Sequence, residues 1–511
     1  MTTETDAIVR TPLGAVRGRV NDRGVSVFVG VPYAESTAGR RFLPPVPKAA
    51  WDGTLDATQH GQICPQGGAM VAGSLGESRT VGPMPDVVAG EDCLIANIWT
   101  PAPDGGKRPV MVWLHGRGFA EGAGSEGWYD GTNLALNGDV VVVTLNHRLN
   151  VFGYLHLTEV GGEAFAGSGV AGILDLAEAL RWVRDNIEAF GGDPGNVTIF
   201  GESGGGRKVC SLLAMPSAEG LFHRAIVQSS VMLRATDPER ATAFARALIA
   251  EAGLAEGDVA GLQALPFEQL TEAYQRTQKA QQGFQCAPTI DAAYFPHHPH
   301  DPEGEPAPSS LRVPLMIGTN KDEMALFMAR HPKRRKLTEP ELHEELQKTY
   351  GDRWQEILDT YRRSRPDDTP WDLLVGIESE PRRLAANQVV EMRHRAGAAP
   401  TYLYLFDWES DFLGGLFKAA HAMEIPFVFD NAGIVPMTGE RTDRGALGKL
   451  MSTTWAAFAR DADPKHDGLP RWEPFDPGRR ATMVFDVPAH AEDDPRSEER
   501  RVWEGDLSHY R

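Results

Sequence analysis

The chain is poor in cysteine and has no long apolar run. Only four cysteines occur in 511 residues, and no two of them form a CxxC pair. A disulfide scaffold is therefore excluded, and at most one structural bridge is expected. The amino terminus, MTTETDAIVRTPLGAVRG, lacks the basic start and apolar stretch of a secretory signal, and no other segment has membrane length. We expect a cytoplasmic protein that does not associate with membranes.

Basic residues are also fewer than acidic residues. Lys and Arg together number 51 against 70 Asp and Glu, which gives a formal charge of −19. This balance disfavours binding to nucleic acid or to an anionic membrane surface, and a soluble acidic protein is expected. No internal repeat or low-complexity linker divides the chain, and we predict a single large domain over residues 1–511.

Short segments rich in Val, Ile, Leu and aromatic residues predict strands. Their apolar character is continuous rather than alternating, which is typical of strands covered on both faces in a largely parallel sheet. We therefore predict an α/β fold with a large, mostly parallel central sheet flanked by helices. The predicted strands are 109–115, 139–146, 197–201, 224–230, 313–320 and 400–408.

Apolar residues at steps of three or four predict helices between and after these strands. One stripe runs over residues 173–190 and stops at a Gly-Gly pair, and another lies around 447–458. Residues 333–397 are more charged and are interrupted by Pro and Gly. We predict that this stretch is a helical insertion within the domain, lying over the sheet and the active site.

A serine between glycines is the first candidate for chemistry. Ser203 lies in FGESGGGRKV, which satisfies G-x-S-x-G, and it follows the apolar run VTIF and precedes a predicted helix. In this context the glycines permit a strained strand-to-helix turn that exposes the hydroxyl and points a helix amino terminus at a developing oxyanion. Five residues alone are weak evidence, because glycines are common in turns without catalytic roles.

A serine nucleophile needs a histidine to accept its proton and a carboxylate to orient that histidine. When such a serine lies in a strand-to-helix elbow, the acid and then the histidine follow it along the chain. Asp322 and Glu323 follow one predicted strand, and His421 lies farther on in GLFKAAHAMEIPFVF, so the order fits. Taken singly, Glu323 is better explained as a solvated loop carboxylate and His421 as a buried structural histidine, and their joint match in order and context reverses this preference.

The chain resembles the type-B carboxylesterase family, which includes cholinesterases and bacterial para-nitrobenzyl esterases. The resemblance implies the α/β-hydrolase fold and a bacterial-type serine carboxylesterase without metal or cofactor. The stretches that carry it are FVGVPYAE, ICPQ, GEDCLIANIWTP, VMVWLHGRGF, NHRLNVFGYL, ALRWVRDNIEAFGGDPGNVTIFGESGGG, GLFHRAIVQSS, GTNKDEMALF and AAHAMEIPFVF.

By this resemblance the family's catalytic acid corresponds to Glu323 and its histidine to His421, with Ser203 as nucleophile. The family's oxyanion hole corresponds to the backbone N–H groups of three residues, Arg117, Gly118 and Gly204. The resemblance also implies a buried ion pair at Arg148, a tuning role for Glu202 next to the nucleophile, and spatial proximity of Cys64 and Cys93.

Three positions depart from the family pattern. The oxyanion loop reads HGRGF with Arg117 where the family usually has Gly, Asn150 also replaces a usual Gly, and the elbow reads GESGGG where GESAGG is commoner. A side chain at residue 117 is penalised if the loop requires a positive φ. Two hypotheses remain: Arg117 points out over the gorge, or its guanidinium faces the pocket and pairs with an anionic substrate group.

Two other motifs are expected to be decoys. GSGVAG at 167–172 fits the dinucleotide fingerprint G-x-G-x-x-G, but no predicted strand precedes it. The segment HHPHD, with His297, His298 and His300, has the composition of a metal site but no second group of ligands at zinc-like spacing.

The sequence thus predicts a serine hydrolase of short- to medium-chain or aryl carboxylic esters that works through an acyl-enzyme. One alternative is a catalytically impaired, esterase-like interaction protein. Another is a hydrolase of carbamates, amides, lactones or esters that bear a free carboxylate. The oligomeric state stays open between a monomer and a small homo-oligomer.

Overall fold

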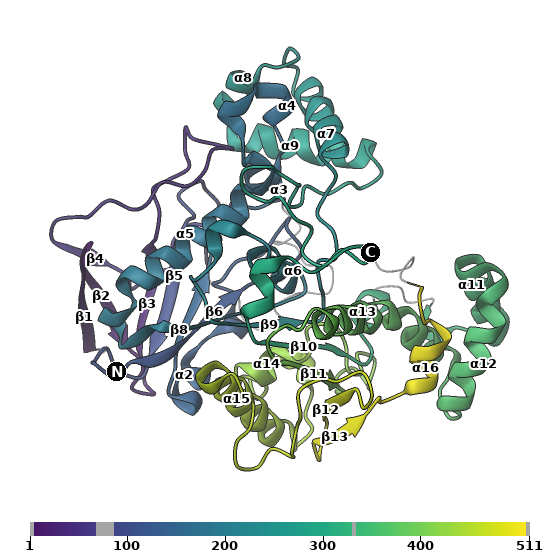
Figure 1. Cartoon of the computed structure of the whole chain (residues 1–511). Coiled ribbons are helices and arrows are strands. Elements are labelled where there is room, and N and C mark those ends of the chain that lie inside the picture. The colour runs from purple at the N-terminus through teal and green to yellow at the C-terminus, as the bar shows by residue number, and fades with distance from the viewer. Residues whose placement is uncertain (1–4, 68–85, 330–333, 507–511) are drawn as a thin grey trace.

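A single large sheet runs through the molecule (Figure 1). The computed structural model describes residues 5–67, 86–329 and 334–506. In the sheet the strand order is β1-β2-β3-β5-β7-β6-β8-β9-β10-β11-β12-β13, and β4 pairs with β2. The strands are β1 Thr5–Thr11, β2 Gly14–Val20, β3 Ser26–Pro32, β4 Thr54–Asp56, β5 Ile95–Thr100, β6 Arg108–Leu114, β7 Val141–Leu145, β8 Gly192–Glu202, β9 Arg224–Gln228, β10 Leu315–Asn320, β11 Thr401–Phe406, β12 Ala481–Phe485 and β13 His490–Asp493.

The centre of the sheet is parallel, as the continuous apolar runs predict. Every neighbouring pair from β7 through β6, β8, β9, β10 and β11 to β12 is parallel. The edges are antiparallel, with β1, β2, β3 and β5 on one side and β13 on the other. All six predicted strands form, and the predicted α/β-hydrolase architecture is confirmed. In such a sheet, ligands bind beyond the carboxyl ends of the parallel strands.

Two apolar layers, one on each face of the sheet, form the core. Alternate residues of β6 divide between them: Val112 and Leu114 belong to one layer, Met111 and Trp113 to the other. Helix α5 (Ala171–Asn186) packs into the first layer and α15 (Arg444–Asp461) into the second. Both helices occur where the apolar stripes predict them. Burial on both faces explains why the central strands carry few polar residues.

The remaining helices cover the sheet or extend from it. Helices α4, α7, α8 and α9 gather at one end of the molecule in Figure 1, and α11 and α12 project at the side opposite β1. The bounds are α2 Thr132–Gly138, α3 Asn150–Tyr154, α4 Thr158–Gly161, α6 Gly204–Leu213, α7 Pro238–Glu251, α8 Val259–Ala264, α9 Phe267–Ala280, α10 Ala325–Met328, α14 Ile425–Val428 and α16 Ser497–Val502.

Three helices occupy the charged stretch at 333–397. They are α11 (Glu339–Tyr350), α12 (Trp354–Ser364) and α13 (Pro370–Arg395). Threonines begin α11 and α13, where each forms a capping box with an acidic residue three positions later. Helix α13 packs against β10 and β11, whereas α11 and α12 lie beyond the sheet. The division into one domain with an insertion stays a prediction.

A buried ion pair joins the segment after β7 to α5. Arg148 Nη2 lies 2.6 Å from Asp175 Oδ1, and Arg148 Nε donates to Asp175 Oδ2 at 2.8 Å. The two side chains are 2% and 0% exposed. The ion pair that the family resemblance implies at Arg148 is therefore present.

Replacing Arg148 with methionine is expected to lower the free energy of unfolding by about 3–5 kcal/mol, because Asp175 would be left buried without a counter-charge. Urea unfolding followed by circular dichroism measures the change. The matched control is Asp185→Asn, which breaks an ion pair with Arg184 whose side chains are 52% and 55% exposed. That variant should lose at most about 1 kcal/mol. Equal losses in the two variants would contradict the assignment.

Candidate active site

Ser203 lies in a sharp turn between β8 and α6. Its backbone has φ 55° and ψ −119°, a conformation that costs energy in any residue with a β-carbon. The two glycines that flank this turn, Gly201 and Gly205, have no room for side chains. A β-carbon on Gly205 would lie 1.9 Å from the carbonyl oxygen of Leu114 in β6, and one on Gly201 would lie 2.6 Å from the backbone of Gly205 in α6. The strand, turn and helix predicted around Ser203 are all present.

Glu323 and His421 form a buried contact beyond the end of β10. Glu323 Oε2 lies 2.5 Å from His421 Nδ1, and its other oxygen accepts from the backbone N–H of Asn320 at 2.9 Å. The side chains of Glu323 and His421 are 0% and 6% exposed. A backbone bridge between Asp322 and Ala420 and a bond from His421 N to Glu323 O hold the two segments together. Of the two candidate acids, Glu323 is the one that contacts the histidine.

The second nitrogen of His421 faces the serine turn. Nε2 lies 3.1 Å from Oε1 of Glu202, the residue that precedes Ser203. That oxygen makes no hydrogen bond in the described part of the chain, and the contact is an ion pair only when the imidazole is protonated. The imidazole therefore spans the space between Glu323 and the serine turn, and all three predicted residues meet in one region.

Burial sets the charge of the imidazole. It lowers the pKa of His421 below the usual 6.5, and the nearby Glu323 opposes this effect. An imidazole with a lowered pKa is neutral at pH 7. Neutral imidazole is the form that can accept a proton from a serine hydroxyl.

Two further carboxyls lie close to the Glu323–His421 pair. Burial and the neighbouring Glu424 and Glu323 raise the pKa of Glu202 well above 4.5. Burial and Glu323 likewise raise the pKa of Glu424 to about 7. Asn320 Nδ2 donates to Glu424 at 2.6 Å, which links Glu424 to the segment that carries Glu323. Sequence reasoning missed Glu424, although it lies three residues after His421 in the family-like stretch AAHAMEIPFVF.

The loop HGRGF lies against the serine turn. A β-carbon on Gly116 would lie 3.6 Å from Ser203 Cβ, and one on Gly204 would lie 2.2 Å from the carbonyl oxygen of Gly118. Arg117 and Gly118 both have positive φ, 62° and 64°. Arg117, Gly118 and Gly204, the three predicted oxyanion-hole residues, are thus brought together, and residue 117 adopts the strained backbone that the sequence comparison raised.

The Arg117 side chain fits neither hypothesis. Its Nε and Nη2 lie 3.2 Å and 3.3 Å from the two oxygens of Glu126, which is fully buried and also accepts from Trp128 Nε1. The guanidinium therefore does not point out to solvent, and its charge is already paired. Glu126 follows nine residues later in an irregular segment, so the pairing could not be predicted from spacing.

Comparison with known proteins decides the family. The model of the carboxylesterase family matches residues 5–503. This chain belongs to the carboxylesterase family. The enzyme is 37% identical to the para-nitrobenzyl esterase of Bacillus subtilis (strain 168), over 97% of this chain and 98% of the relative, and 33% identical to the phenmedipham hydrolase of Pseudarthrobacter oxydans, over 94% and 95%.

Solved structures agree with this assignment. The Geobacillus stearothermophilus carboxylesterase EST55 is 40% identical, covers 97% of this carboxylesterase and 99% of its own chain, and has a TM-score of 0.82. An esterase from Clostridium hathewayi that can hydrolyse aliphatic aromatic polyesters is 34% identical, with a TM-score of 0.83 and coverage of 98% and 99%. The protein is a serine carboxylesterase, and its activity is the hydrolysis of carboxylic esters.

A buried lysine lies behind the oxyanion loop of this carboxylesterase. Lys208, on α6, is fully buried and donates from Nζ to the carbonyl oxygen of His115 at 2.8 Å. Burial lowers the pKa of Lys208 to about 7. Its ammonium also lies 5.9 Å from the ring centroid of Phe119. The lysine thus ties helix α6 to the loop that carries Arg117. No sequence signal other than its place after the elbow pointed to it.

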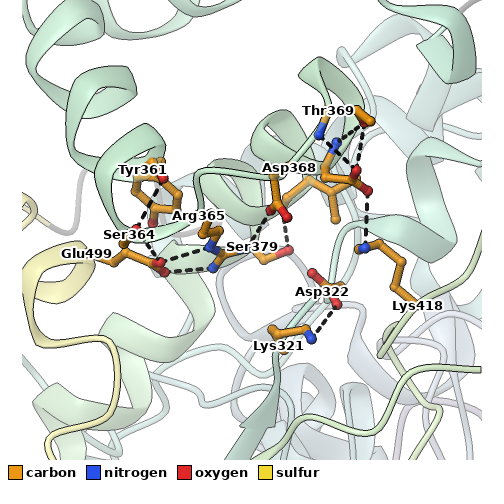
Figure 2. Close-up of polar contacts among 12 residues, drawn as sticks. Lys321, Asp322, Tyr361, Ser364, Arg365, Asp368, Thr369, Ser379, Lys418 and Glu499 are labelled. Atoms are coloured by element: carbon orange, nitrogen blue, oxygen red, sulfur yellow. Dashed lines mark hydrogen bonds and ion pairs between the residues drawn. The ribbon is translucent and has the colours of Figure 1, made fainter.

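Asp322, the neighbour of Glu323, lies beside a separate charged cavity of about 450 Å³. Lys321 Nζ lies 3.8 Å from Asp322 Oδ2, and Arg365 and Glu499 pair at 2.7 Å in the same wall (Figure 2). Neither Ser203 nor His421 lines this cavity. Its ion pairs stabilise the segment that carries Glu323, the residue that corresponds to the family's catalytic acid.

The decoy motifs have structural roles in this carboxylesterase. GSGVAG forms a 3-10 turn at Ser168–Val170 that leads into α5, and another 3-10 turn, not a strand, precedes it. His298 accepts from the Ala235 N–H, and His300 bonds to Met232 O. Within residues 5–67, 86–329 and 334–506, no group of three or more His, Cys, Asp or Glu could hold a metal, and no helix could span a membrane.

The cysteine and asparagine positions named by the family resemblance are also accounted for. Cys64 and Cys93 are free, buried thiols. A hydrogen bond to Cys64 raises the pKa of Cys93, so the implied proximity is present without a bridge. Asn150 has φ 44°, and its amide donates to Pro65 O at 2.9 Å and Ala120 O at 3.1 Å. Its side chain thus holds together the loops that meet where the family usually has Gly.

Proposed function

We propose that Ser203, Glu323 and His421 form the catalytic triad of this esterase. The observation that carries the proposal is the 2.5 Å contact between Glu323 and His421 Nδ1, with Nε2 directed at the serine turn. Serine, imidazole and carboxylate supply the nucleophile and the base, so the mechanism uses neither metal nor cofactor.

In the proposed mechanism, His421 Nε2 accepts the proton of Ser203 as the serine oxygen attacks the ester carbonyl carbon. The backbone N–H groups of Arg117, Gly118 and Gly204 bind the oxyanion of the tetrahedral intermediate. The bond to the alcohol oxygen breaks, and the imidazolium protonates the departing alcohol. Water then attacks the acyl-enzyme: His421 accepts the proton of the water and returns a proton to the Ser203 oxygen as the acid is released. The Glu323 carboxylate stabilises the imidazolium each time it forms.

Short- to medium-chain and aryl carboxylic esters are the proposed substrates. The names of two relatives support this range: one is a para-nitrobenzyl esterase, and the other, a medium-chain fatty acyl-CoA hydrolase, supports the acyl chain length although its substrate is a thioester. The net charge of −19 disfavours a nucleic-acid partner, and this statement and the cytoplasmic location stay predictions. Whether the protein is a monomer or a small homo-oligomer is a question for sedimentation.

Covalent labelling tests the proposed triad. The enzyme is incubated with a fluorophosphonate and digested, and the modified peptide is sequenced by mass spectrometry. We expect stoichiometric labelling of Ser203 together with a burst of nitrophenol when 4-nitrophenyl butanoate is mixed with the enzyme. Labelling of another residue, or steady hydrolysis without labelling, would refute the triad. Absence of both labelling and hydrolysis would instead favour an esterase-like interaction protein.

The pH dependence of kcat/KM follows from the buried imidazole. Because burial lowers the pKa of His421, the base is neutral over a wider range than free histidine. We expect kcat/KM for a neutral aryl ester to rise with pH through a midpoint below 6.5 and to stay level towards pH 8. Initial rates between pH 4.5 and 8.5 at constant ionic strength measure this. A midpoint above 7 would contradict the neutral imidazole.

A further inference from the structure

Arg382 is a half-buried cation without a carboxylate partner. It lies in α13 directly after Pro381. Its Nη1 contacts the sulfur of Met324 at 3.0 Å, and its guanidinium carbon lies 5.4 Å from the ring centroid of Phe327. In the described part of the chain, no carboxylate oxygen comes within ion-pair distance of it. The contacts of its head group are therefore with a thioether and an aromatic face, neither of which neutralises its charge.

These two contacts place Arg382 at the proposed active site. Met324 follows Glu323 in the chain, and the Phe327 ring lies 5.1 Å from the His421 ring. The positive charge of Arg382 contributes to the lowered pKa of His421 and acts against the raised pKa of Glu202. Arg382 thus influences groups on both sides of the serine turn.

Two other arginines of this region do have carboxylate partners. Arg383, the next residue, lies 2.8 Å from Glu380, and Arg365 lies 2.7 Å from Glu499. The chain has a formal charge of −19, so carboxylates are abundant. A partly desolvated guanidinium without a partner costs free energy, and this cost is recovered when an anion binds it.

Two other arginines near the site have hydrogen-bond partners. Arg117, which the sequence suggested for an anionic group, is paired with Glu126. Arg207 donates to Ser230 Oγ at 3.0 Å. Arg382 only partly offsets the effect of burial on Glu202, whose pKa stays well above 4.5. A carboxylate on a ligand is a partner that would neutralise Arg382.

We propose that this esterase selects esters that carry a carboxylate a few bonds from the scissile ester, such as half-esters of dicarboxylic acids, and that Arg382 binds that carboxylate. The planar guanidinium can donate two parallel hydrogen bonds to a carboxylate, which fixes the substrate relative to Ser203. The inference rests on the proposed function, since it assigns the substrate class of the same site.

The test compares matched pairs of stable alkyl esters at pH 8. Monoethyl succinate, glutarate and adipate are each paired with the neutral ester of equal chain length, ethyl butanoate, pentanoate and hexanoate, and acid release is followed by pH-stat. We expect the parent enzyme to favour the best half-ester by at least about tenfold in kcat/KM, because the free energy of a hydrogen bond between charged groups corresponds to a factor of about this size.

Variants of Arg382 identify the group responsible. Arg382→Gln should lower kcat/KM for the half-ester by about 10- to 100-fold, mainly through KM, and change the neutral ester by less than about threefold. Arg382→Lys keeps the charge but loses the paired donors, so an intermediate loss is expected. The matched control is Arg395→Gln, which removes an exposed arginine from the same helix and should change neither rate.

Each outcome decides the proposal. Absence of a half-ester preference in the parent enzyme, or equal losses on both ester classes in Arg382→Gln, would overturn it. At pH 8 the imidazole is neutral with or without Arg382, so a change in the pKa of His421 cannot imitate the expected result. If Arg382→Gln does not fold, the parent preference and its reduction in Arg382→Lys serve as the test. Failure of the proposed triad is distinguishable, because neither ester would then be hydrolysed through labelled Ser203.

Discussion

Replacing Ser203 with alanine should lower kcat for 4-nitrophenyl butanoate by about 10⁴- to 10⁶-fold and abolish labelling by a fluorophosphonate. The variant has no oxygen to attack the ester, so no acyl-enzyme can form. Alanine is smaller than serine and keeps the β-carbon that the turn already accommodates at φ 55°. The fold should therefore be unchanged, which circular dichroism and thermal unfolding can check.

Two controls make this result specific. Ser217→Ala replaces an exposed serine beyond the carboxyl end of α6 and should keep full activity. The double variant Ser203→Ala/His421→Gln should be no slower than Ser203→Ala alone, because residues that act as one unit do not lose activity additively. A Ser203→Ala enzyme within tenfold of the parent, or a further large loss in the double variant, would separate the two residues and refute the proposed proton transfer.

The strands that the sequence predicts are those buried on both faces. β6 and β7 contain apolar residues in most positions, and this leaves a signal that needs no tertiary information. The edge strands β1 and β13 were not predicted, and neither were β5 and β12, although every residue of these two is buried. β1 alternates between exposed and buried residues and β13 is fully exposed, so both are defined by pairing with a neighbour rather than by composition.

The residues of the candidate site also fall into two groups, those that the sequence predicts and those that it does not. Ser203, Glu323 and His421 could be predicted because each lies in a local stretch that resembles the family, and their order along the chain fits the chemistry. Arg382 and Lys208 could not be predicted, because their relevance depends on which helix face meets the site. In the sequence Arg382 is one of two adjacent arginines, and only packing shows that its neighbour is paired and that it is not.

Adding a methyl group at residue 204 should lower kcat by about 10²- to 10³-fold, although alanine is the commoner residue at this position in the family. A β-carbon there would lie 2.2 Å from the carbonyl oxygen and 2.4 Å from the nitrogen of Gly118. Since φ of Gly204 is not positive, the limitation is space and not backbone strain. The loop must therefore move, and with it the amides proposed to bind the oxyanion.

The close approach of the loop links this effect to Arg117. Residue 117 has φ 62° and is tied to Glu126, so the loop cannot retreat freely from the serine turn. Arg117→Gly removes the tie and permits other backbone angles. We expect the double variant Gly204→Ala/Arg117→Gly to recover at least tenfold of the activity that Gly204→Ala loses, measured as kcat on 4-nitrophenyl butanoate.

Gly105→Ala, in an open exposed turn, is the control for a methyl group alone. Full activity in Gly204→Ala would show that the loop adjusts without cost, and an absence of recovery in the double variant would show that Arg117 and Gly204 are independent departures from the family pattern.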